Sequence, residues 1–216
     1  LIGTWYVNPG RNHYIQNKSY WETVAPNGGQ ELANHTMTHT GASTYEEVVY
    51  EVGEVSKIIW KIRGQEDYAS LIAFNRGGGT SWNEEDLAKV LADFCNIDRQ
   101  TKLGMPSLGK SVVAGSTSNQ MMEIIPKILE DSLLGRLHFH GIAEKNGIPP
   151  MDVGTAGVWI AEFNIFLDKL KKYENQLWNA GFIQVFKYIK ERQTSTLTVN
   201  KTSETVYSLY LDCSLD

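Results

Sequence analysis

Apolar residues recur along the chain with two alternating periods, which predicts strands and helices in turn. Helical spacing is clearest over residues 44–63, where Gly64 follows as a stop signal. The remaining helices are predicted over 19–26, 81–95 (with a capping box from Ser81 to Glu84), 118–134 (interrupted near Pro126), 159–173 and 183–192. Short apolar runs predict strands over 3–7, 30–35, 70–74, 111–114, 136–142 and 176–179.

The order of these elements predicts an α/β fold. Strands alternate with helices from about residue 3 to residue 192, a pattern typical of a parallel sheet or of a (β/α) barrel. From Thr194 onward, Thr, Val, Ser, Tyr and Leu alternate without intervening helices, as in a β-ribbon. We therefore expect one domain over 1–193 and a β-strand extension over 194–216, whose strands pair with each other outside the barrel.

Composition narrows the classes of partner. The 42% apolar and 21% charged residues are ordinary for a globular protein with a core, and the net charge of −5 without a basic block argues against nucleic acid. No apolar run approaches the length of a membrane span. Sequons at Asn17, Asn34 and Asn200 weakly favour a secreted, extracellular protein. Cys95 and Cys213 could form one disulfide or remain two buried thiols, and the sequence leaves both readings open.

Four of the five histidines form two tight groups at the ends of predicted strands. His35 and His39 are four residues apart, so that on one helical turn both imidazoles would project from the same face and could bind one metal ion. His138 and His140 lie two apart on a later strand and would point the same way. Arg76, followed by three glycines, ends a third strand, where a glycine lets a backbone N–H approach a substrate closely. Sites in βα folds gather at such strand ends.

At these residues the chain resembles the polysaccharide deacetylases, the NodB-homology group of carbohydrate esterase family 4. Residues 31–39 (Glu-Leu-Ala-Asn-His-Thr-Met-Thr-His) are similar to the family's His-[Ser/Thr]-x-x-His motif and its strand. Residues 3–7 resemble the strand that precedes it, and 137–142 resemble the late Leu-x-His motif. Order and spacing fit over roughly residues 1–192. The resemblance implies a distorted (β/α) barrel that removes acetyl groups from a polysaccharide or oligosaccharide.

The resemblance also implies roles for individual residues. His35 and His39 would hold a divalent metal, usually zinc, which activates a water and polarises the acetyl carbonyl. His140, in preference to His138, would be the general acid. Arg76 matches the arginine that holds the catalytic base, and the backbone of Gly79 could donate to the oxyanion. We expect these groups to converge on one cleft, and we expect a monomer that binds an acetylated sugar polymer.

Some family features differ or are missing. The arginine motif Arg-x-Pro-Tyr is replaced by Arg-Gly-Gly-Gly-Thr-Ser-Trp, in which Trp82 is a candidate groove wall or a core residue. Asp98 is a candidate for the Asp that tunes the catalytic histidine, although a surface turn is favoured. The Thr-Phe-Asp-Asp segment, which supplies the base and the third metal ligand, is expected upstream of Gly3. The chain, which opens at Leu1, is therefore expected to be a trimmed or incomplete piece with little activity and no fully ligated metal.

Two alternatives remain open. The first is a non-catalytic carbohydrate-binding relative with a vestigial metal site. The second is a deacylase of the same fold that acts on a small amide.

Overall fold

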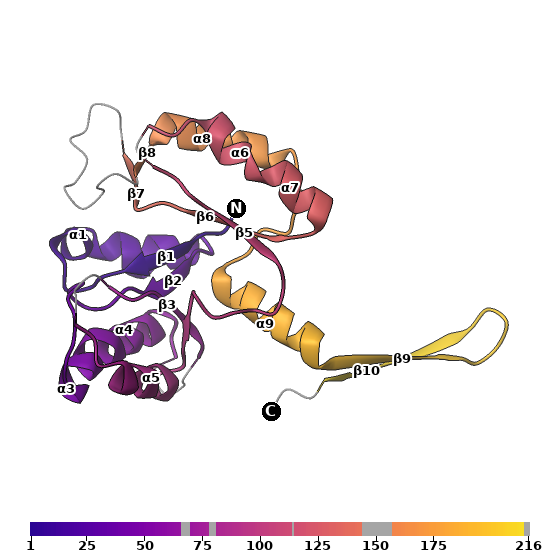
Figure 1. The fold of residues 1–216 in the computed structure, drawn as a ribbon, viewed down its shortest axis with the longest axis horizontal. Coiled ribbons are helices and arrows are strands. Elements are labelled where there is room, and N and C mark those ends of the chain that lie inside the picture. Colours follow the sequence, from indigo (N-terminus) through magenta and orange to yellow (C-terminus); the bar gives the residue numbers. More distant parts are fainter. Residues whose placement is uncertain (66–69, 78–80, 114, 144–156, 214–216) are drawn as a thin grey trace. The chain divides into compact units, whose positions relative to one another are not determined.

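The predicted alternation of strands and helices is present in the computed structural model, which describes residues 1–65, 70–77, 81–113, 115–143 and 157–213 (Figure 1). Contacts divide the chain into two units, one of residues 2–103 with 180–216 and one of residues 104–179 with Leu1. Within the described ranges, no helix is both long and apolar enough to cross a membrane. The assignment of 1–193 to one domain stays a prediction.

The first unit is built on a four-stranded parallel sheet. Its strands are β1 (Thr4–Val7), β2 (Glu31–Asn34), β3 (Ile72–Phe74) and β4 (Asn96–Asp98), in the spatial order β1-β2-β3-β4. All three pairings are parallel, so the strands end at the same edge of the sheet. The predicted α/β class is confirmed. The described strands form this open sheet and smaller ladders, and closure into a barrel stays a prediction.

Helices cover both faces of this sheet, because successive strand residues point to opposite faces. On β2, Leu32 belongs to a cluster with Val55 and Ile59 of the long helix. Its neighbour Ala33 points the other way and packs with Ile183 of the C-terminal helix. The helices of the unit are α1 (Asn12–Gln16), η1 (Tyr20–Val24), α2 (Ala25–Asn27), α3 (Tyr45–Val48), η2 (Val49–Gly53), α4 (Glu54–Ile62), α5 (Glu84–Asp93) and α9 (Phe182–Thr194).

The long helix predicted over 44–63 is confirmed as the continuous run α3-η2-α4. It begins at a capping box in which the Thr44 hydroxyl accepts from the backbone of Glu47 and the Glu47 carboxylate accepts from the backbone of Thr44. Its middle turn is a π-helix, Val49–Gly53, a widening of the helix that is often found at functional sites. This turn carries Glu51 toward the loop that follows β2.

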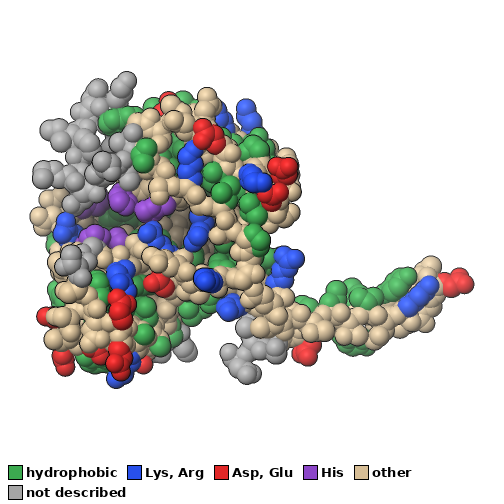
Figure 2. All heavy atoms as spheres, viewed as in Figure 1, with side chains coloured by type: hydrophobic (Ala, Val, Ile, Leu, Met, Phe, Trp, Pro, Cys, Tyr) green, Lys and Arg blue, Asp and Glu red, His purple; other side chains and the backbone are tan. Residues whose placement is uncertain are grey.

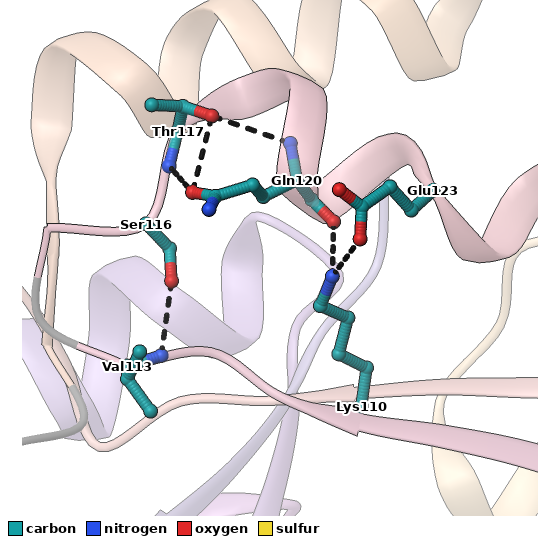
Figure 3. A network of polar contacts seen from close by, with 6 residues as sticks. All are labelled: Lys110, Val113, Ser116, Thr117, Gln120 and Glu123. Carbon is teal, nitrogen blue, oxygen red and sulfur yellow. Dashed lines mark hydrogen bonds and ion pairs between the residues drawn. The ribbon is translucent and has the colours of Figure 1, made fainter.

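The described part of the second unit contains two short parallel ladders and three helices. β5 (Ser107–Ser111) pairs with β6 (Leu134–His138), and β7 (Gly141–Ala143) pairs with β8 (Gly157–Trp159). The helices are α6 (Ser118–Met122), α7 (Ile124–Asp131) and α8 (Ile160–Lys171). Figure 3 shows how α6 is fixed: Thr117 and Gln120 form a capping box, and Lys110 of β5 donates to the Gln120 carbonyl and pairs with Glu123.

The C-terminal residues pair as predicted. After α9, β9 (Ser195–Lys201) and β10 (Tyr207–Cys213) form an antiparallel hairpin that extends beyond the helix as an arm (Figure 1). The register places Leu209 opposite Val199 and Leu211 opposite Leu197, so these four side chains share one face. All four are more than half exposed, and apolar side chains are visible along the arm in Figure 2.

Some local predictions are wrong. Residues 176–179 are turn and irregular structure, not a strand. The N-cap of α5 is Asn83, whose side chain accepts from Glu85 and Asp86, so the box from Ser81 is not formed. The strand predicted over 111–114 lies earlier, at Ser107–Ser111. The strand predicted over 136–142 is interrupted between His138 and Gly141.

Cys95 and Cys213 both lie within the described residues and are not joined in a disulfide. Cys95 is half-buried, whereas Cys213 lies at the exposed end of β10. The disulfide is therefore not formed, and the alternative of two buried thiols is wrong for Cys213.

Candidate functional site

The His35–His39 segment is a loop at the end of β2, and not a helical turn. The strand ends at Asn34, one residue before the predicted end at His35, and residues 35–39 then turn without helical structure. Two of them lie in the left-handed region, Thr36 at φ 70° and His39 at φ 63°. This conformation is rare for a β-branched residue such as Thr36 and costs about 1–3 kcal/mol per residue unless the surroundings impose it. The two histidines are therefore brought together by a loop and not by the four-residue spacing of a helical turn.

Hydrogen bonds impose the shape of this loop. Every backbone N–H from residue 35 to 39 has an acceptor: the Val7 carbonyl for His35, the Asn34 side chain for Thr36, the Glu51 carbonyl for Met37, the Glu51 carboxylate for Thr38 and the Thr36 hydroxyl for His39. On the carbonyl side, the Asn8 side chain donates to His35 and Thr36, and Gly10 donates to Met37. The loop is thus held along its whole length.

The side chain of Asn34 fixes the start of the loop through buried hydrogen bonds. It is fully buried, and its Nδ2 lies 2.9 Å from the Val52 carbonyl, 3.1 Å from Ser56 Oγ and 3.2 Å from Asn96 Oδ1. Its Oδ1 accepts from the Thr36 backbone at 2.9 Å. Because these bonds fill both ends of the amide, Asn34 cannot carry a glycan in the folded protein, although it stands in a sequon.

The two imidazoles of the loop meet. Their Nε2 atoms lie 3.2 Å apart, and the ring centroids are 4.6 Å apart at an interplanar angle of 71°. The Nδ1 atom of His35 lies 2.9 Å from the Asn75 carbonyl, an oxygen that can only accept. The Asn75 side-chain Nδ2, an amide donor, lies 3.1 Å from the same Nδ1, so Asn75 holds the His35 ring through both its backbone and its side chain. The predicted proximity of the two rings is confirmed.

These distances fit a shared metal ion. Two imidazole nitrogens at about 2.0–2.1 Å from a tetrahedral zinc would lie roughly 3.3 Å from each other, close to the 3.2 Å found. A backbone carbonyl behind the first imidazole is a frequent outer partner of metal-binding histidines. In the part of the chain that the structure describes, no cluster of three or more His, Cys, Asp or Glu side chains surrounds a possible metal position. The role of His35 and His39 as metal ligands stays a prediction.

Arg76 follows β3, as expected, but its guanidinium is already paired. Its Nη2 lies 2.5 Å from Glu84 Oε2, at the start of α5, and both side chains are largely exposed. The next residue, Gly77, is buried against the histidine loop: a Cβ there would lie 2.4 Å from Thr36 Oγ1 and 3.1 Å from His39 Cα. This glycine therefore permits a close approach to the loop itself. Gly79, the predicted oxyanion donor, lies outside the described residues.

Trp82 packs on a core cluster. It lies against the buried residues Ala42, Val48, Val52, Phe74, Leu87 and Val90, and its backbone bridges to Ala42. This position agrees with the core alternative, and a role as a groove wall stays a prediction. Asp98 ends β4 and its carboxylate accepts from the backbone of Gln100 at 2.7 Å, as in the favoured turn.

His138 and His140 belong to the second unit. His138 is the last residue of β6, opposite Ser111 of β5, and is half-buried, whereas His140 follows the strand and is exposed. Their rings are 5.1 Å apart at 79°, while Phe139 between them packs against Phe163. Both imidazoles therefore point away from the Phe139 side chain on the same side of the backbone, although the two residues do not lie on one continuous strand. Convergence with His39 and Arg76 stays a prediction, because those residues lie in the other unit.

Sequence reasoning missed the residues that hold the loop, namely Asn8, Asn34, Glu51 and Asn75. Asn34 and Asn75 could have been found, because each is a polar residue at the buried end of an apolar strand. Glu51 offered a similar signal as a carboxylate between Tyr50 and Val52, on the apolar side of the long helix. No local pattern singled out Asn8.

The chain has a weak similarity to known proteins. No family model matches the chain, and no curated protein matches it. Among solved structures, the chain is similar to a CE4 family pseudoenzyme of Bacillus anthracis, with 13% identity over 86% of this chain and 56% of that one, at a TM-score of 0.47. The chain is also similar to a mutant of that protein described as having restored enzymatic activity. The identity is 14% over 86% of this chain and 57% of the mutant, at a TM-score of 0.48. The chain thus spans little more than half the length of those proteins. This similarity is too low to assign the chain to that family.

Proposed function

We propose that this chain belongs to a metal-dependent hydrolase that removes acetyl groups from a polysaccharide or oligosaccharide. The observation that carries the proposal is the His35–His39 pair at the end of β2, with Nε2 atoms 3.2 Å apart. The motif that contains them resembles that of the polysaccharide deacetylases. A divalent metal such as zinc, when bound there, would supply an activated water and polarise the acetyl carbonyl.

The chain's own residues would orient that site. The Asn75 carbonyl holds the His35 ring so that Nε2 faces His39. His140 is proposed to protonate the leaving group, for which an exposed imidazole at a strand end is suited. Gly79 and Trp82 are proposed to contact substrate, and Arg76 to hold a carboxylate base. Such an enzyme would act outside the cell on an acetylated sugar polymer.

One observation favours the alternative of a non-catalytic carbohydrate-binding relative. The guanidinium of Arg76, which a catalytic site would use to hold the base, pairs with Glu84 on the surface of α5. In that case the histidine pair would still bind metal, but bound sugar would not be turned over.

Zinc titration by calorimetry tests the metal site. We expect one zinc ion per chain, bound weakly because two histidines leave the site short of the usual third protein ligand. We expect this binding to be lost in His35→Ala and His39→Ala. His13→Ala is the matched control, because it removes an exposed imidazole from α1 and should leave binding unchanged. Wild-type protein that binds no zinc, or His35→Ala protein that binds it as the wild type does, would refute the proposed site.

Acetate release then separates the two functions. Zinc-loaded protein is assayed on chitin oligomers, acetyl-xylan and small acetylated amides. Release from the sugars that is abolished by His39→Ala supports the hydrolase. Zinc and sugar binding without any release supports the non-catalytic alternative.

A further inference from the structure

We propose that Glu51 is a positioning residue for the histidine loop, which fixes residues 36–40 so that His35 and His39 bind one metal ion. The inference rests on the proposed metal site and assigns a role to a side chain that would not touch the metal. Glu51 lies in the π-helical turn Val49–Gly53, and only 4% of its surface is exposed.

The contacts of Glu51 are directed at the loop. Its Oε2 accepts from the Thr38 backbone at 2.9 Å, and its Oε1 accepts from the Thr38 hydroxyl at 2.5 Å and from the Thr40 hydroxyl at 3.3 Å. Its backbone carbonyl accepts from Met37 at 2.8 Å. One residue therefore binds three positions around the loop, Met37, Thr38 and Thr40.

The burial of this carboxylate calls for an explanation. A buried carboxylate is costly unless hydrogen bonds or an opposite charge compensate it. Among the residues that the structure describes, the ion pairs include none with Glu51. The compensation comes from the loop donors instead, which means that displacing the loop would leave the charge buried without partners. Glu51 and the loop therefore hold each other in one arrangement.

The π-turn explains why this carboxylate reaches the loop. A π-helical turn adds a residue to the helix and shifts its side chains relative to a regular α-helix. Here the shift occurs beside the two left-handed residues, Thr36 and His39, which stay in that conformation only if their neighbours are fixed. Met37 and Thr38 lie between them, and these are the residues whose N–H groups Glu51 accepts.

Loosening this contact should weaken metal binding without removing a ligand. Changes to outer partners of metal ligands typically cost about 10–100-fold in metal affinity. Glu51→Gln keeps the size of the side chain and one acceptor oxygen, but loses the charge and one of the acceptors. We expect it to weaken zinc binding by about 10-fold or more, while the protein keeps its fold by circular dichroism.

The experiment compares the zinc affinity of three proteins: the wild-type chain, Glu51→Gln and Glu54→Gln. The affinity is measured by competition with a chelator. Glu54 is the matched control, because it lies one turn along the same helix, is exposed and pairs with Lys57. Thr38→Val, which removes the hydroxyl that Glu51 accepts from, provides a second variant if Glu51→Gln does not fold, and it should weaken binding in the same direction.

Amide hydrogen exchange in metal-free protein gives a readout that does not depend on zinc. Exchange at Thr38 and His39 should be faster in Glu51→Gln than in the wild type and unchanged in Glu54→Gln. Wild-type zinc affinity in Glu51→Gln would overturn the inference and leave the proposed site intact. Wild-type protein that binds no zinc would refute the proposed function and this inference with it.

Discussion

Replacing Gly77 by alanine tests how closely the third strand end is fitted to the histidine loop. The added Cβ would lie 2.4 Å from Thr36 Oγ1, about 1 Å inside the ordinary contact of 3.4 Å. Thr36 is fully buried and its hydroxyl already accepts from His39, so it has little freedom to move. Overpacking of this kind costs about 1–3 kcal/mol, a substantial share of the 5–15 kcal/mol by which folded proteins are stable.

The assay is thermal unfolding together with zinc titration. For a chain of this size, such a loss lowers the melting temperature by about 2–12 °C, at roughly 2–4 °C per kcal/mol. Because the clash falls on Thr36 and on the backbone of His39, zinc affinity should fall as well. Gly109→Ala is the control, since a Cβ there meets only the Arg136 carbonyl at 4.0 Å. Equal melting temperatures for Gly77→Ala and the wild type would show that the loop can yield, and the argument for a rigid site would fail.

Three further predictions concern stability and reactivity. Burial raises the pKa of Glu31 above its ordinary value of 4.5, although it accepts from Ile183 at the start of α9. The folded protein therefore holds this proton more tightly than the unfolded chain, and stability from Glu31 is fullest below pH 4.5 and falls as the pH rises through the raised pKa. The urea midpoint of Glu31→Gln should therefore increase relative to that of the wild type as the pH rises. A difference between the two midpoints that stays constant from pH 4 to 7 would contradict this. Ser132 ends α7 in the left-handed region at φ 52°, so Ser132→Gly should raise the free energy of unfolding by about 0.5–1 kcal/mol, and a lower urea midpoint would argue against strain at this cap. Cys213 should react with a thiol reagent at once and the half-buried Cys95 more slowly, which a Cys213→Ser variant resolves; equal rates would contradict the burial.

The sequence predicted elements where one local pattern dominates. The apolar repeat from Val48 to Ile62 marks the buried face of one helix, and the alternation after Thr194 marks two strands that pair with each other. Each period can be recognised without tertiary information. The prediction failed where contacts between residues distant in sequence determine the local structure. Residues 176–179 have strand-like composition but follow a series of turns and pair with no strand in the described structure.

For the candidate site, the sequence identified the two histidines that are proposed to bind metal and missed the residues that orient them. His35 and His39 were recognisable from their spacing at a strand end, although a loop and not a helical turn brings them together. Left-handed conformations at Thr36 and His39 cannot be read from their residue types, because β-branched threonine rarely adopts them and most histidines do not. They depend on Glu51 and Gly77, which are brought to the loop by the helix after it and by the next strand.

The buried amide of Asn34 has a consequence for producing the protein. A eukaryotic secretory pathway attaches glycans to Asn-x-Ser/Thr acceptors on surface-accessible chain. Asn34 precedes His35 and Thr36 in such an acceptor, yet its side chain lies fully inside the fold, with hydrogen bonds at both its nitrogen and its oxygen. A chain modified there before folding could not close the network beneath the loop. Secretion from a glycosylating host would therefore divide the product into an unmodified native fraction and a modified fraction that is retained or degraded, and a bacterial host would avoid the loss.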